Sequence, residues 1–260
     1  MPSRSPPRPL TPPVRLVLLK PSNPQNLGAI ARAMKNMGLA DWAVVELGTH
    51  DFATARRVAV HAEDLLDRPL VARTLEEAVA DCAWVVGTTP RRVRGRRTLA
   101  PAEVAAEVLA RAPARTAIVF GEERSGLTNE EALRCHDLSA IPSDPEQPSL
   151  NLAQAVLLYA WEVRRAALAA AAPVPAARGD ARRAPARGRA GGAATDAELA
   201  GLEQLLREVL RASGFLAGPE RHAVRDLTDA LRRARLTRRE ARLWNAALRT
   251  LGREVGSGRT

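Results

Sequence analysis

Two carboxylates lie in a short segment flanked by glycines. The segment FGEERSGL, residues 120–127, places Glu122 and Glu123 between two glycines, after an apolar run and before a helix-like segment. Glycine lets backbone N–H and C=O groups approach a ligand closely. The segment has neither the spacing of a phosphate-binding P-loop nor that of a dinucleotide-binding glycine motif. An ordinary turn, in which one glutamate caps the next helix, is the alternative interpretation.

Polar residues also end a proline-rich segment. Residues 141–151 read IPSDPEQPSLN, and the three prolines favour an extended loop. Ser149 or Asn151 lies where a helix N-cap is needed. A capped helix explains Ser149, but it does not explain why Asn151 and Gln154 enter an otherwise apolar helix. These two amides are therefore candidates for a functional site.

A third polar segment opens a helix near the start of the chain. Residues 23–28 read NPQNLG, and the helix that follows carries Asn26 and Arg32. Lys35 and Asn36 follow Arg32 at i+3 and i+4, so they share its face of the helix. Arg32 is equally well explained as a solvated helix residue.

Basic residues gather in one loop of an otherwise neutral region. The chain of 260 residues has a net charge of +10, yet residues 14–171 carry 19 basic and 19 acidic residues. A field concentrated on one loop favours a polyanionic partner more than diffuse basicity does. A solvated loop in an arginine-rich protein is the alternative. The five arginines of this loop are Arg91, Arg92, Arg94, Arg96 and Arg97.

Strand-like and helix-like segments alternate through residues 14–169. Continuous apolar strands that alternate with helices predict an α/β fold with a parallel sheet covered on both faces. Ligands bind beyond the carboxyl ends of the strands in such sheets, where all four polar segments fall. The expected strands are 14–20, 42–47, 83–88, 116–121 and 138–142, and the expected helices are 23–37, 54–67, 74–81, 101–110, 129–135 and 151–169.

Composition separates the remaining chain into a tail, a linker and a helical extension. We expect a disordered Pro-rich tail over 1–13 and an Ala/Pro/Arg/Gly linker over 170–194. Residues 195–260 show only helical patterns. The first helix carries an apolar face between 199 and 210 and ends at Gly214, and the last opens with the capping box TRRE at 237–240. One side of that last helix carries Leu243, Trp244, Ala247 and Leu251.

The sequence also argues against several classes of protein. Cys82 and Cys135 are isolated, so we expect neither a disulfide scaffold nor a metal site. The first residues lack the apolar region of a signal peptide, and the longest apolar run is too short to span a membrane. We therefore expect a cytoplasmic protein.

The three polar segments, in this order, resemble the motifs of the SpoU (TrmH-like) family of SPOUT RNA methyltransferases. The first motif matches at Asn26 and Arg32, the second over 120–131 with its glutamate at Glu123, and the third over 141–151. The resemblance covers residues 14–166 without a gap. The segments NPQNLGAIARAMKNMG, HAEDLL, GTTPRR and LTNEE, with the helical extension, are most similar to the TrmJ-type tRNA 2′-O-ribose methyltransferases.

This resemblance implies a fold, a cofactor and a set of site residues. The implied SPOUT fold ends in a C-terminal trefoil knot, forms a homodimer and binds S-adenosylmethionine in the knot, and here a small all-α extension follows it. Pro90 departs from the family, which often has a small residue there. The implied cofactor-binding residues are Thr88, Thr89, Pro90, Gly121, Glu122, Ile141, Pro142, Pro148, Ser149, Leu150 and Asn151. The implied catalytic residues are Arg32, Asn26, Glu123, Ser149 and Asn151.

The implied reaction is methylation of a ribose 2′-hydroxyl in the tRNA anticodon loop, at a position-32 type cytidine or uridine. The family assigns the arginine that matches Arg32 as the base, but a guanidinium with a pKa above about 12 could instead hold a phosphate and the hydroxyl in line. We expect the Arg91–Arg97 loop to contact RNA phosphates. The alternatives are the same chemistry on ribosomal RNA and a non-catalytic RNA-binding protein of this fold.

Overall fold

The computed structural model of the chain describes residues 12–171, 192–215 and 221–257. Its strands are β1 (Val14–Leu19), β2 (Trp42–Val45), β3 (Leu70–Ala72), β4 (Trp84–Thr88), β5 (Thr98–Leu99), β6 (Thr116–Phe120) and β7 (Asp137–Ser139). Its helices are α1 (Pro24–Met37), α2 (Phe52–Ala59), α3 (Glu63–Leu66), α4 (Leu75–Val79), α5 (Pro101–Arg111), α6 (Asn129–Arg134), α7 (Leu152–Ala171), α8 (Asp196–Ala212), α9 (Arg221–Arg233) and α10 (Arg238–Ser257).

The seven strands form one parallel sheet in the order β3-β2-β1-β6-β4-β7-β5. The chain starts in the middle, moves to one edge through β2 and β3, and then crosses to the other half. Both central strands, β1 and β6, are completely buried, which explains their continuous apolar runs. The expected α/β fold with a parallel sheet is confirmed.

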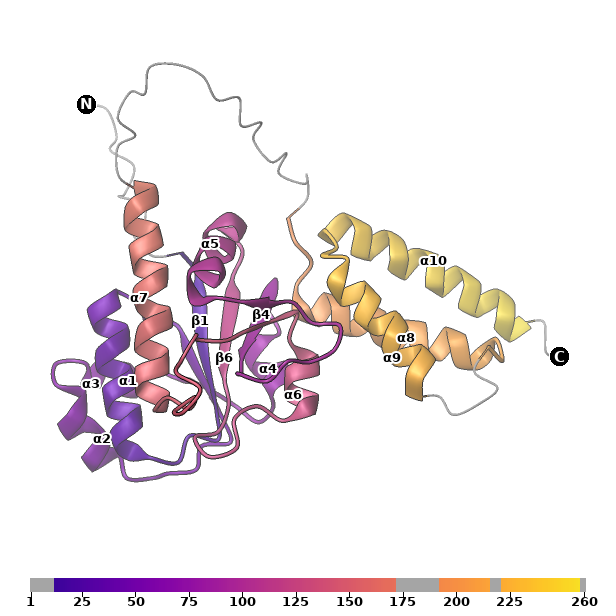
Figure 1. The fold of residues 1–260 in the computed structure, drawn as a ribbon. Coiled ribbons are helices and arrows are strands. Elements are labelled where there is room, and N and C mark those ends of the chain that lie inside the picture. Colours follow the sequence, from indigo (N-terminus) through magenta and orange to yellow (C-terminus); the bar gives the residue numbers. More distant parts are fainter. Residues whose placement is uncertain (1–11, 172–191, 216–220, 258–260) are drawn as a thin grey trace, which may run out of the picture. The chain divides into compact units, whose positions relative to one another are not determined.

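Helices cover both faces of the sheet. In Figure 1, α1 and α7 lie on one side of the strands, whereas α4 and α6 lie on the other. Helix α7 packs against α1 and α5, and α1 packs against α2. The α1–α2 contact requires Gly28, because a Cβ atom there would lie 2.2 Å from the carbonyl oxygen of Ala55. The position of α1 is therefore fixed by packing.

Two local features differ from the expectation. The helix expected over 54–67 is two helices, because Val60 and His61 have φ angles of 31° and 64°, a left-handed conformation that an α-helix cannot contain. The side chain of Asp51 caps α2, so this helix begins at Phe52. Strands β3 and β5, of three and two residues, were not expected. Each has a single buried residue, whereas β7, which is also short, is buried throughout.

A second compact unit contains α8, α9 and α10 together with the segment Val79–Trp84. The backbone amides of Asp196 and Ala197 donate to the carbonyl oxygens of Cys82 and Ala80, at 2.7 and 3.0 Å. Helix α8 packs against α9 and α10. The core of this unit comprises Ala194, Leu199, Leu202, Val209, Leu236, Ala241 and Leu248.

Helix α10 packs on the core of this unit through a face other than the apolar side that carries Leu243, Trp244 and Leu251. Ala241 and Leu248 are buried, whereas Leu243, Trp244 and Leu251 are exposed. The capping box at Thr237 is confirmed by its bonds with Glu240. A period of 3.6 identifies apolar stripes but does not tell which of two stripes on one helix faces the core.

Several expected segments fall partly outside the described residues. The expected tail lies outside them except for residues 12 and 13, and most of the expected linker, 172–191, is also outside. Residues 192–194 are described and belong to the second unit, because Ala194 donates its amide to Leu236 and Ala193 bridges Thr237. Within the described ranges, no helix is long and apolar enough to cross a membrane.

Candidate active site

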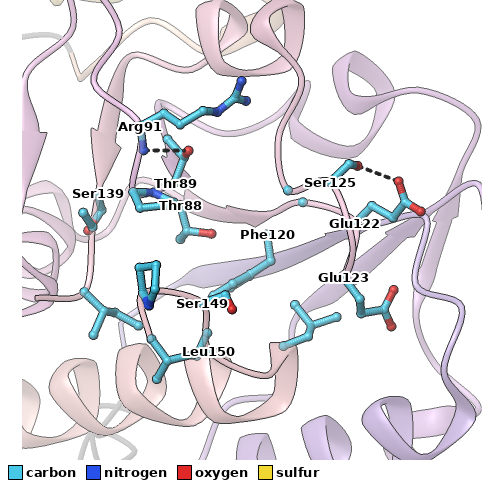
Figure 2. A pocket seen from close by; sticks show the side chains of 18 of the residues that line it. Thr88, Thr89, Arg91, Phe120, Glu122, Glu123, Ser125, Ser139, Ser149 and Leu150 are labelled. Atoms are coloured by element: carbon cyan, nitrogen blue, oxygen red, sulfur yellow. Dashed lines mark hydrogen bonds between the residues drawn. The ribbon is translucent and has the colours of Figure 1, made fainter. Parts of the chain in front are cut away.

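A pocket of about 290 Å³ lies where the loops after β4, β6 and β7 meet the start of α7. Figure 2 shows Thr88, Thr89 and Arg91 on one side of it and Glu122, Glu123 and Ser125 on the other. Its position at the carboxyl ends of adjacent parallel strands agrees with the general rule for such sheets. The volume is near the lower limit of about 300 Å³ that is usual for ligand pockets.

The pocket brings together most of the residues expected to bind a cofactor. Pro142 and Asn151 are not among its lining residues, and neither are Asn26 and Arg32. The expected residues that line it are Thr88, Thr89, Pro90, Gly121, Glu122, Ile141, Pro148, Ser149 and Leu150, together with Glu123 and Arg91. Lining residues that the sequence did not single out include Phe120, Ser139, Leu152, Ala155 and Tyr159.

Phe120 and Tyr159, two of the lining residues that the sequence did not single out, form an apolar wall of the pocket, and Tyr159 also begins a buried series of hydrogen bonds. The rings of Phe120 and Tyr159 meet edge to face, with centroids 5.5 Å apart. The Tyr159 hydroxyl donates to Ser139 Oγ at 2.7 Å, and Ser139 Oγ donates to the carbonyl oxygen of Leu99 at 2.8 Å. Burial raises the pKa of Tyr159 to about 12, so its hydroxyl keeps its proton. Both hydroxyl protons in this series of hydrogen bonds are donated within the protein, so we assign the series a structural role.

The shape of the loop after β6 depends on its glycines. A Cβ atom at Gly121 would lie 2.2 Å from the backbone carbon of Gly126 and 2.3 Å from the nitrogen of Leu127. Gly126 has a φ of 66°, in the left-handed region, and its amide donates to the Glu122 carbonyl oxygen. Gly121 is therefore required by the loop itself rather than by close approach of a ligand.

The Glu123 carboxylate is the acceptor in a dense cluster of donors. It accepts from the backbone amides of Ser22 and Asn23, from Ser22 Oγ and from Asn26 Nδ2, at 3.2–3.3 Å. Partial burial raises the pKa of Glu123, but the hydrogen bonds outweigh burial and the net pKa lies below its usual value. The carboxylate is ionised at neutral pH.

Asn151 joins the third motif to this cluster. Its Nδ2 donates to Asn26 Oδ1 at 2.9 Å, and its Oδ1 accepts from the amides of Ala153 and Gln154 at the start of α7. Asn151 is therefore the helix cap, not Ser149, which is exposed and lines the pocket. The amides of Asn26 and Asn151 connect all three sequence motifs.

Arg32 lies on the exposed side of α1, six residues beyond the buried Asn26. It forms neither a hydrogen bond nor an ion pair with the residues that the structure describes. Its guanidinium is therefore available to a partner outside this chain.

The five arginines of the Arg91–Arg97 loop differ in their burial and in their contacts with the rest of the protein. Arg96 is only 8% exposed, and its guanidinium donates to the carbonyl oxygen of Leu133. Arg97 forms ion pairs with Asp137 and Glu107 at 3.0 and 2.8 Å, and these carboxylates raise its pKa. Arg91 donates to Asn129 and Leu127, although it is exposed. Burial of Arg96 argues against the expected RNA contact there, whereas Arg92 and Arg94 face solvent.

No group of three or more His, Cys, Asp or Glu side chains in the described ranges could hold a metal ion. Cys82 and Cys135 are both buried, and neither forms a disulfide with another described residue.

Comparisons with known proteins identify one matching family and several relatives. The sequence profile described as the SpoU rRNA methylase family matches residues 13–161. A Pseudomonas aeruginosa protein, tRNA (cytidine/uridine/adenosine-2′-O-)-methyltransferase TrmJ, is 46% identical over 163 residues, which cover 60% of this chain and 62% of that protein. The tRNA (cytidine/uridine-2′-O-)-methyltransferase TrmJ of Klebsiella pneumoniae is 44% identical over 160 residues, covering 60% and 65%. The chain thus spans less than two thirds of the length of these relatives.

Solved structures extend the similarity beyond the sheet. The crystal structure of TrmJ from Z. mobilis ZM4 matches 91% of this chain and 98% of its own, with a TM-score of 0.75 at 28% identity. A probable methylase family protein from Haemophilus influenzae matches 95% of this chain and 99% of its own, with a TM-score of 0.58 at 31% identity.

Proposed function

Because this chain belongs to the SpoU rRNA methylase family, we propose that it is an S-adenosylmethionine-dependent RNA methyltransferase that modifies a ribose 2′-hydroxyl of tRNA. The observation that carries this proposal is the convergence of the three motifs around one pocket, linked through Glu123, Asn26 and Asn151. The names of the relatives support tRNA as the substrate. The anticodon loop, with a position-32 type cytidine or uridine, is the specific acceptor that we propose.

The residues of the pocket fit S-adenosylmethionine. Leu150, Ile141 and the Phe120–Tyr159 wall offer an apolar surface for a base, and the turn at Gly121 brings backbone polar groups to the same place. The Glu122 carboxylate on the pocket wall suits a cationic ligand. The cofactor, when bound, would supply the methyl group to the hydroxyl.

The residues of this chain would act mainly by positioning. Methyl transfer to a hydroxyl is an in-line displacement, so its rate depends on the alignment of donor and acceptor. The exposed guanidinium of Arg32 would hold a phosphate and the 2′-hydroxyl, because its planar fork can bind two oxygens. The Ser149 hydroxyl, on the pocket rim, would orient the ribose. The 2′-hydroxyl would release its proton to solvent on the side of the ribose that faces Arg32.

Two basic surfaces would bind the RNA. One is the part of the loop after β4 that carries Arg92 and Arg94, close to the pocket wall. The other is a side of α10 whose arginines recur at helical spacing and are exposed: Arg238, Arg242, Arg249 and Arg253. Phosphate contacts of this kind are independent of sequence and depend on salt.

The expected homodimer and knot are also part of the proposal. Helix α7 carries an exposed apolar stripe at i, i+4 and i+11, formed by Leu157, Trp161 and Leu168, with Trp161 48% exposed. A second copy of α7 could cover this stripe, since large exposed apolar patches mark interfaces. Family membership leads us to propose that the chain forms the C-terminal trefoil knot and works in the cytoplasm.

Mapping of methyl groups tests the proposed function. Purified protein and isotope-labelled S-adenosylmethionine would be incubated with unmodified tRNA transcripts and with ribosomal RNA fragments, and the products mapped by mass spectrometry. We expect label on one anticodon-loop ribose, and none on a transcript whose position 32 is a 2′-deoxynucleotide. Label only on ribosomal RNA would assign that substrate instead. No label on either RNA would leave a non-catalytic RNA-binding protein.

A further inference from the structure

The Glu123 carboxylate accepts hydrogen bonds from the residues at the start of α1. Both of its oxygens accept from the Ser22 amide, at 3.3 and 3.2 Å, and one of them also accepts from Asn23 N and Asn26 Nδ2. The other oxygen accepts from Ser22 Oγ at 3.2 Å. These four donors match the roughly four lone-pair sites of an ionised carboxylate. Little capacity remains for a substrate proton.

Ser22 is placed against this carboxylate by the turn that follows β1. Lys20 has a φ of 50°, in the left-handed region, and reverses the chain directly after the strand. Ser22 then precedes Asn23, the N-cap of α1, whose own side chain accepts from Gln25 N. A negative charge beside a helix N-terminus is favoured by the helix dipole. Ser22 is the residue that adds a side-chain hydroxyl to the backbone donors.

We propose that Ser22 and Glu123 form a brace that joins the start of α1 to the loop after β6, so that Ser22 is a positioning residue and Glu123 is not the proton acceptor. This inference rests on the proposed function for its effect on turnover. Glu123 lines the pocket, whereas Asn26 and Arg32 belong to α1. The brace therefore fixes the acceptor-side residues relative to the wall of the cofactor pocket.

Substitution of Ser22 tests the effect of the brace on turnover. A small displacement of α1 misaligns the acceptor but leaves the pocket wall intact, and such displacements are costly in in-line reactions. We expect Ser22→Ala to lower kcat about tenfold while the Kd for S-adenosylmethionine, measured by calorimetry, changes less than twofold. Ser22→Thr keeps the hydroxyl and should keep most of the rate. Thr49→Ala, which removes another loop hydroxyl that contacts a backbone amide, is the matched control.

The pH dependence of kcat distinguishes a brace from a base. If Glu123 accepted the proton, loss of a donor in Ser22→Ala would raise its pKa and move the acid limb of the profile. The brace predicts the same fractional loss of kcat at every pH, with an unmoved limb. A shifted limb, or a Kd that changes as much as kcat, would overturn the inference.

Amide hydrogen exchange tests the brace without any activity. Glu123→Gln keeps the size of the side chain but removes its charge, so the amides of Ser22 and Asn23 should exchange at least tenfold faster; Ser22→Ala should accelerate Asn23 to a smaller extent. If the wild-type chain methylates no RNA but the exchange rates change, the brace stands and the proposed function fails. Unchanged exchange and unchanged kcat in a folded, active enzyme would overturn the brace alone.

Discussion

The side chains of the site separate into those held by the protein and those turned outward. Glu123, Asn26 and Asn151 are fixed by hydrogen bonds to one another, and Asn151 also caps α7. Arg32 and Ser149 are exposed. The three hydrogen-bonded residues hold the loops of the site in place, whereas the two exposed residues can contact a substrate.

Arg32→Ala should abolish turnover without affecting cofactor binding. Because Arg32 does not line the pocket, calorimetry should give a wild-type Kd for S-adenosylmethionine, while methyl transfer falls by about 100-fold or more, as expected when an oriented acceptor is lost. Arg32→Lys should restore little, since an ammonium lacks the planar fork. Arg68→Ala, another exposed arginine, serves as control. Retention of most of the kcat in Arg32→Ala would refute the role.

Leu150→Arg should weaken cofactor binding at least tenfold, because it introduces a long charged side chain into the apolar part of the pocket. The variant should unfold at the wild-type temperature, since Leu150 is 36% exposed. Val71→Arg, at an exposed position of β3, is the control.

Gly121→Ala should instead lower the unfolding temperature, because its Cβ would overlap the backbone of Gly126. Calorimetry and thermal unfolding together separate the two effects, and wild-type affinity in Leu150→Arg would place the cofactor elsewhere.

Among the elements, the loop between β4 and β5 combines structural and exposed arginines. Arg96 and Arg97 bind Leu133, Asp137 and Glu107 and so hold the loop to the sheet. Arg92 and Arg94 are left to meet an external anion.

The double variant Arg92→Gln, Arg94→Gln should reduce the salt dependence of tRNA binding. Each lost phosphate contact lowers the slope of log K against log salt by roughly 0.7–0.9, so two contacts give roughly 1.4–1.8. Affinity for S-adenosylmethionine should not change, because neither arginine lines the pocket. The double variant Arg68→Gln, Arg73→Gln, at exposed positions on either side of β3 at the opposite edge of the sheet, controls for net charge. A wild-type slope in filter binding would return this loop to a solvated surface.

The pairing of β4 with β7 should depend on pH through His136. Its Nδ1 accepts from the Val85 amide at 3.1 Å, and burial lowers the pKa of His136 from 6.5 to about 4. The unfolded chain therefore takes up a proton at a higher pH than the native protein. The contribution of His136 to the free energy of unfolding should be fully present above pH 6.5 and should decrease by about 3 kcal/mol as the pH falls toward 4.

His136→Asn keeps an acceptor for the Val85 amide but removes the titrating group. Urea unfolding of wild type and variant at pH 7 and pH 4.5 gives the difference due to His136, because carboxylates contribute to both proteins equally. We expect the variant to lose about 2 kcal/mol less on acidification. Equal losses would mean that His136 does not titrate in this range.

At the scale of the whole molecule, two helices carry apolar stripes that the described residues leave uncovered. One stripe is on α7, at Leu157, Trp161 and Leu168, and the other is on α10, at Leu243, Trp244 and Leu251. The α7 helix also packs on α1, which carries Arg32. An interface on α7 would therefore bring a second copy close to α1, the helix that carries Arg32.

Trp161→Glu should convert the protein to a monomer if α7 forms the dimer interface. A carboxylate in the centre of an apolar interface is desolvated without a partner, which costs several kcal/mol. Light scattering after size-exclusion chromatography should show the wild-type mass halved. Val71→Glu, at an exposed position of the edge strand, should leave the mass unchanged. A dimeric Trp161→Glu variant would move the interface away from α7.

The amino-acid sequence alone predicts the parallel α/β sheet, five of its seven strands and the meeting of the polar loops at one edge. Apolar runs and helical periods depend on near neighbours in the chain, and parallel strands necessarily gather their carboxyl ends. The family motifs also identified many of the residues that line the pocket, but not Phe120, Ser139 or Tyr159. The break at Val60 and the two short edge strands had no such local signal.

The roles of the functional side chains depend on contacts between segments that are distant in the sequence. Glu123 and Ser22 are 101 residues apart, and Asn151 and Asn26 are 125 apart, so no local pattern could reveal that one residue holds the other. The same holds for Arg96, whose burial depends on the position of Leu133, and for α10, whose core face is chosen by α8. Hydrogen bonds and burial between distant segments exist only once the chain has folded, and they separate the residues that position the site from those that can meet a substrate.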